Sequence, residues 1–171
     1  GYPAMSKDKA GQDAMLPADP CFILGNHRMT LFAHVSGKYE LITGERGWAR
    51  LNHGGKNLGQ NQSGIRIMDK SYELTGEISD VGVDRKQVFG TGYACYQYTC
   101  PEMVQVTKRI SVLPSLKCGE GNSAFFLEVA VENRGKKPLT VDYWEKILAN
   151  YQMMTHQDEA QQAGSLCLAY R

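Results

Sequence analysis

The residue types best suited to chemistry lie close together in the stretch Arg46–Asn52. Sugars are held by aromatic faces that stack on their C–H surfaces, while a few polar groups bond the hydroxyls and fix orientation. If this stretch is a strand, the side chains of Arg46, Trp48, Arg50 and Asn52 share one face. Guanidinium groups are rarely buried unless paired, so we expect that face to be an accessible rim. We predict carbohydrate binding at these four residues; the alternative is a core tryptophan with arginines at the strand rim.

Other residues that could take part in binding or catalysis give weaker evidence of function. Trp144 follows Tyr143 and has Ile147 nearby, a setting that favours the core. Glu128 and Glu132 share one face of a predicted strand, which is typical of a solvated surface. The five cysteines are scattered and no Cys-x-x-Cys occurs, so we predict no metal site. We also predict no cofactor, because the glycine-rich loop after Asn52 lacks the Gly-Lys-[Ser/Thr] of a phosphate loop.

The elements that must position these residues read as strands, because short runs rich in β-branched and aromatic residues are separated by glycine and asparagine turns. Strands are predicted at Cys21–Leu24, Met29–Val35, Tyr39–Ile42, Gly64–Asp69, Tyr72–Leu74, Gln87–Phe89, Tyr93–Thr99, Met103–Leu113, Ala124–Glu132 and Leu139–Leu148. The last two are predicted to form a hairpin around Arg134–Lys137. Lys108 interrupts the apolar face of its strand, so we expect it near a strand end or a sheet edge. His53–Gly64 is predicted to be a loop, and the fold class is an all-β, antiparallel two-layer sandwich.

The chain length, the net charge and the lengths of the apolar runs fit one globular domain. A length of 171 residues favours one domain, and we place a single β-sandwich domain at residues 20–171. Residues 1–19 show no apolar period and include Pro3 and Pro17, so we expect a mobile leader or a segment laid over the domain. The net charge of +1 gives no electrostatic case for nucleic acid, and no apolar run approaches the roughly 20 residues that span a bilayer, so we predict neither partner. The polar start without methionine favours export to the periplasm, with a cytoplasmic location as the alternative. Near the C-terminus, Leu166–Tyr170 is a candidate short strand.

Several segments resemble one protein family. These are LGN at Leu24–Asn26, HVSGKYE at His34–Glu40, RLN at Arg50–Asn52, GQNQSGIRIMD at Gly59–Asp69, FGTGYACYQY at Phe89–Tyr98 and FLEVAVENRGKKPLTVDYWEKIL at Phe126–Leu148. Together they resemble the N-terminal β-domain of glycoside hydrolase family 94, which holds the cellobiose and chitobiose phosphorylases. The resemblance spans about Cys21 to Tyr151. It implies a galactose mutarotase-like super-sandwich, in an abbreviated or partial version.

The resemblance also implies a function. In that family the catalytic acid and the phosphate site lie in a helical barrel that follows the β-domain, and no such barrel occurs in this sequence. We therefore expect a noncatalytic, carbohydrate-associated domain that shapes the substrate entrance or a subunit contact, with no activity in this chain alone. The implied partners are a β-glucan-type oligosaccharide, a helical-barrel catalytic domain and further copies of the chain. The alternatives are an aldose mutarotase-type enzyme, which would need a His–Glu pair that no spacing marks here, and a structural or interaction β-sandwich.

Overall fold

The computed structural model describes residues 6–7, 13–14, 21–43, 49–53, 59–76, 80–115, 121–150 and 152–153. Every regular element in these ranges is a β-strand, and all pairs of neighbouring strands are antiparallel. The predicted all-β class is therefore confirmed. No helix among the described residues is long and apolar enough to cross a membrane.

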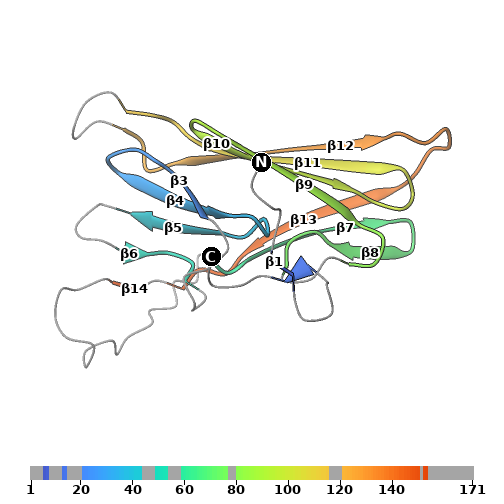
Figure 1. Ribbon diagram of the computed structural model, residues 1–171, viewed down its shortest axis with the longest axis horizontal. Coiled ribbons are helices and arrows are strands. Elements are labelled where there is room, and N and C mark those ends of the chain that lie inside the picture. Colours follow the sequence, from blue (N-terminus) through green and yellow to red (C-terminus); the bar gives the residue numbers. More distant parts are fainter. Residues whose placement is uncertain are drawn as a thin grey trace.

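One layer of the fold is a four-stranded sheet in the order β12-β11-β10-β9 (Figure 1). Its strands are β9 (Asp84–Gly90), β10 (Tyr93–Thr99), β11 (Val104–Val112) and β12 (Phe125–Asn133). Alternate residues of β11 are buried, as the sequence predicts for Val104, Val106, Lys108 and Ile110. This sheet therefore presents one apolar face to the interior and one largely polar face to solvent.

The second layer combines two sheets (Figure 1). The five-stranded sheet has the order β14-β6-β5-β4-β3, and the three-stranded sheet has the order β13-β7-β8. Their strands are β3 (Cys21–Gly25), β4 (Met29–His34), β5 (Tyr39–Thr43), β6 (Ala49–Arg50), β7 (Asn61–Ile67), β8 (Lys70–Glu73), β13 (Val141–Ile147) and β14 (Gln152–Met153). Within the predicted leader, β1 (Ser6–Lys7) and β2 (Asp13–Ala14) pair with each other.

Two asparagine side chains join these sheets along β5. β6 pairs only with the last two residues of β5, so the rest of that strand edge needs other partners. Asn52 accepts a hydrogen bond from the Leu41 N–H at 2.8 Å and donates one to the Tyr39 carbonyl at 2.9 Å. Asn61, the first residue of β7, accepts from the Tyr39 N–H at 2.8 Å and donates to the Gly37 carbonyl at 3.3 Å. The two amides thus take the place of a neighbouring strand and connect β5 to β7.

The core lies between the two layers and draws on both. Phe22 of β3 stacks on Phe89 of β9 with ring centroids 3.8 Å apart, and Tyr39 of β5 lies 5.6 Å from Phe125 of β12. Apolar burial of this kind is the main favourable term in folding. The fully buried large side chains include Tyr39, Tyr96, Tyr98, Leu31, Ile65, Ile67, Leu74, Ile110, Val104 and Val106.

The predicted hairpin between the two C-terminal strands is wrong. Both strands exist, but β12 pairs with β11 and β13 pairs with β7. The connection over residues 134–140 therefore crosses from one layer to the other. Polar residues in this connection are compatible with a hairpin and also with a crossing between layers, so they do not distinguish the two. The partly buried residues of both strands, such as Leu127 and Tyr143, pack on the same core. The apolar faces of β12 and β13 are both covered when the two strands lie in opposite layers and face each other across the core.

Three further expectations are corrected. Lys108 lies in the middle of a nine-residue inner strand and is fully buried, instead of near a strand end or sheet edge. Trp144 is half-buried on the outer face of β13, because the residues on either side of it, Tyr143 and Glu145, point inward. The predicted loop ends earlier than Gly64, since β7 already begins at Asn61.

Candidate functional site

The four predicted carbohydrate-binding residues are only partly described by the structure. Arg46 and Trp48 lie outside the described residues, as does the candidate strand Leu166–Tyr170. Arg50 is half-buried at the end of β6, whereas Asn52 is fully buried.

Asn52 therefore does not lie on an accessible rim, and both ends of its amide are already bonded to β5. Arg50 and Asn52 would share a face only in a continuous strand, but β6 ends at Arg50 and the chain bends at Leu51. Asn52 then turns towards the interior while Arg50 stays at the surface.

Arg50 joins a small polar cluster with Glu40 and His53. The Arg50 Nε lies 3.3 Å from Glu40 Oε1, and His53 Nδ1 lies 3.2 Å from the same oxygen. Arg50 Nη1 also lies 3.1 Å from His53 Nδ1. Glu40 is alternate to the core residues Tyr39 and Leu41, so the cluster forms on the face of β5 that points away from the core.

This cluster contains a His–Glu pair that sequence reasoning missed. The side chains of Arg50 and His53 are 22% and 20% exposed, whereas that of Glu40 is 4% exposed, so the first two reach the protein surface and the carboxylate is buried. No sequence spacing marks the pair, because Glu40 and His53 meet only through the pairing of β5 with the chain around β6. The one available signal was His53, which directly follows the predicted binding stretch.

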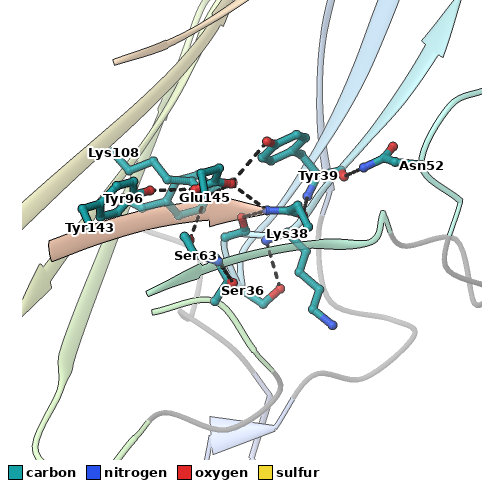
Figure 2. Close-up of polar contacts among 12 residues, drawn as sticks. Ser36, Lys38, Tyr39, Asn52, Ser63, Tyr96, Lys108, Tyr143 and Glu145 are labelled. Carbon is teal, nitrogen blue, oxygen red and sulfur yellow. Dashed lines mark hydrogen bonds and ion pairs between the residues drawn. The ribbon is translucent and has the colours of Figure 1, made fainter. Parts of the chain in front are cut away.

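A second polar cluster lies inside the sandwich (Figure 2). Lys108 of β11 reaches across the core to Glu145 of β13, with Nζ 3.1 Å from Oε1 and 3.2 Å from Oε2. The same ammonium lies 3.0 Å from Ser63 Oγ on β7. Figure 2 shows Lys108, Glu145 and Tyr39 converging from three strands. This cluster ties the four-stranded sheet to both parts of the opposite layer.

Both carboxylate oxygens of Glu145 carry further hydrogen bonds. Tyr143 donates to Oε2 at 2.6 Å, while Tyr39 donates to Oε1 at 3.2 Å and Asn61 Nδ2 donates to it at 3.4 Å. These donors compensate the cost of placing a carboxylate among apolar groups.

The electrostatics follow from burial and from the carboxylate. Burial lowers the pKa of the Lys108 ammonium, and the negative charge of Glu145 works against this shift. Burial and the proximity of Glu145 both raise the pKa of the Tyr39 and Tyr143 hydroxyls well above the ordinary value of about 10. The two tyrosines therefore stay protonated and remain hydrogen-bond donors at neutral pH.

The interior cluster is suited to holding the layers in register. Lys108 is 0% exposed and its charge is matched by one carboxylate whose two oxygens are occupied. The sequence analysis missed this cluster, although two signals were available: a lysine in an apolar strand face, and Glu145 in phase with the inward-facing Val141 and Tyr143. Among the described residues, no group of three or more His, Cys, Asp or Glu side chains is placed to hold a metal ion.

Comparisons of the chain with protein-family models, with curated proteins and with solved structures gave no significant match.

Proposed function

We propose that this chain is a noncatalytic, carbohydrate-associated β-sandwich domain of the super-sandwich type. In a larger glycoside phosphorylase-like protein it would shape the substrate entrance or a subunit contact. The segments that resemble family 94 support this proposal, because they coincide with strands of both layers: Asn61–Ile67 is β7, and Phe89–Tyr98 spans the β9–β10 turn and most of β10.

The observation that carries the proposal is the closed interior cluster. A general acid or base must reach the proton that it transfers, directly or through one water. Lys108 is completely buried, and Glu145 is bound by three protein donors besides the ammonium. This buried acid–base pair therefore serves the fold, which favours a binding or structural role.

The surface cluster supplies the chemistry for sugar hydroxyls. Arg50 and His53 are partly exposed, and the buried Glu40 carboxylate orients both. A guanidinium group carries its donors in a rigid, planar arrangement, and the contact with Glu40 holds that of Arg50 in one orientation. The cluster adjoins the predicted Arg46–Asn52 stretch.

Two measurements test the proposal. Isothermal titration with cellotetraose should give heat of binding, whereas incubation with cellobiose and phosphate should release no glucose 1-phosphate above a heat-treated control. Turnover above that control would overturn the noncatalytic part. Absence of binding to cellotetraose and to chitotetraose would overturn the carbohydrate part.

A mutarotase-type enzyme is the second candidate, and the His53–Glu40 pair favours it. Proton transfer at a sugar anomeric centre requires a positioned acid and base, and a carboxylate that holds one imidazole nitrogen leaves the other for substrate. Polarimetry of freshly dissolved α-glucose tests this function. Faster mutarotation that is lost in His53→Ala and Glu40→Gln, but kept in His27→Ala, would favour it over the noncatalytic proposal. A rate equal to that of buffer would reject it.

A further inference from the structure

Trp144 lies against the outer surface of the three-stranded sheet. Gly64 of β7 is its partner directly across from β13. Two indole atoms lie so close above Gly64 that a methyl group there would collide with the ring. The absence of a side chain at Gly64 therefore lets the indole rest against the sheet, where it stays half-buried.

Polar side chains flank the indole on both sides. Residues two positions away on the same strand share its face, and so do their cross-strand partners. Towards one end of β13, Asp142 accepts hydrogen bonds from Arg66, at 3.0 Å from Nε and also from Nη2. Towards the other end, Lys146 pairs across the strands with Gln62. All four flanking side chains are exposed, in contrast to the buried residues of β7 that point inward.

We call this surface the aromatic platform, which consists of Trp144 with Arg66, Asp142, Gln62, Lys146 and Glu73. The formal charges of the aromatic platform sum to zero. Two cations, Arg66 and Lys146, are matched by two anions, Asp142 and Glu73, the latter opposite Gly64 on β8. Such a surface offers both hydrogen-bond donors and acceptors and carries no net charge. It complements an uncharged ligand rich in hydroxyl groups, and it is a poor match for a polyanion such as nucleic acid.

We infer that this aromatic platform binds an uncharged oligosaccharide, with the C–H face of one sugar ring on the indole and neighbouring hydroxyls on Gln62, Arg66 and Asp142. An aromatic face supplies the apolar contact, while a few polar groups set orientation. The inference rests on the proposed carbohydrate association and adds a second binding surface, on β13 and β7, to the surface cluster around Arg50. Adjacent sugars of a linear chain would then follow the strand direction past Asp142 or Lys146.

The two tryptophans of the chain allow each candidate site to be read separately. In the full chain, Trp48→Phe leaves Trp144 as the only tryptophan, and Trp144→Phe leaves Trp48. In a titration with cellotetraose, followed by tryptophan fluorescence and by calorimetry, the Trp48→Phe variant should show a change in the fluorescence of Trp144. Trp144→Ala should weaken binding at least tenfold. Phe126→Ala, which removes an exposed aromatic ring from the outer face of the other layer, should leave binding within threefold of the unmodified protein.

A second pair of variants tests the platform without removing a tryptophan, a change that can unfold a protein. Gln62→Ala changes the platform, and Gln97→Ala is its matched control. Both glutamines are exposed on outer sheet faces, but Gln97 lies on the other layer. Gln62→Ala should weaken binding several-fold and Gln97→Ala should not. If the unmodified protein binds cellotetraose, and if both Trp144→Ala and Gln62→Ala bind it with the same affinity as the unmodified protein, the aromatic platform is overturned while the carbohydrate function stands. If the unmodified protein binds no oligosaccharide, both are overturned.

Discussion

Replacing Glu145 by glutamine removes the carboxylate that is bound to the buried Lys108 ammonium. Removing one partner of a buried ion pair costs about 3–5 kcal/mol, because the remaining charge is left uncompensated. Lys108 is 0% exposed, so it cannot extend its ammonium into water. Its alternative is to lose the proton, which at pH 7 costs about 5 kcal/mol, or about 1.4 kcal/mol for each pH unit below an ordinary pKa of about 10.4. We therefore expect Glu145→Gln to lower the free energy of unfolding by about 3–5 kcal/mol.

The loss should have a characteristic pH dependence. In the Glu145→Gln variant, burial acts on Lys108 without the opposing carboxylate, so the folded state holds the lysine neutral while the unfolded state protonates it. The unfolded state then binds one more proton. The free energy of unfolding of the variant should therefore rise with pH, by about 1.4 kcal/mol per unit between pH 7 and pH 9. The difference from the unmodified protein should narrow over the same range.

Urea unfolding at pH 7, 8 and 9, followed by tryptophan fluorescence, measures both effects. Glu128→Gln is the matched control, since Glu128 lies 3.9 Å from Arg109 and its side chain is 69% exposed. That variant should change the free energy of unfolding by less than about 1 kcal/mol. The double variant Lys108→Met/Glu145→Leu should be more stable than Glu145→Gln, because it removes both charges together. A loss below about 1 kcal/mol for Glu145→Gln, independent of pH, would refute the reasoning.

Three further predictions follow from single contacts. Asn52→Ala should lower the free energy of unfolding by about 2–4 kcal/mol in urea titrations, because two buried backbone groups of β5 lose their partners; an effect no larger than that of the exposed Asn122→Ala would contradict this. Met103 is exposed and has a φ of 62°, so Met103→Gly should raise the free energy of unfolding by about 1 kcal/mol, and an unchanged or lower melting temperature would count against the backbone strain. The raised pKa of Tyr39 and Tyr143 means that the folded state keeps protons that the unfolded state releases above about pH 10, so stability should fall as pH rises past 10. In an alkaline absorbance titration these tyrosines should ionise only together with unfolding, and reversible ionisation in the native state would argue against their burial.

Most strands of the fold were predictable because their signal is local. The two-residue alternation in Val104–Val112 and turn residues such as Ser36-Gly37 depend only on neighbouring positions in the sequence. The structure confirms the strands that they indicate. The predicted carbohydrate face was less predictable. It assumed an unbroken strand through Asn52, whereas β6 stops at Arg50 and the asparagine completes the edge of β5.

The sequence by itself determined the fold class, the approximate strand positions and the inward face of β11, since each depends on the period of side chains along one strand. Only the tertiary structure decided which strands pair, and with that the partners of the unusual residues. Lys108 and Glu145 are 37 positions apart and belong to opposite layers, so no local pattern links them. Trp144 looked like a core residue from its neighbours, yet its side of β13 faces outward because Tyr143 and Glu145 occupy the interior. The physical reason is that burial selects the pairing that covers every apolar face at once, which is a property of the whole chain.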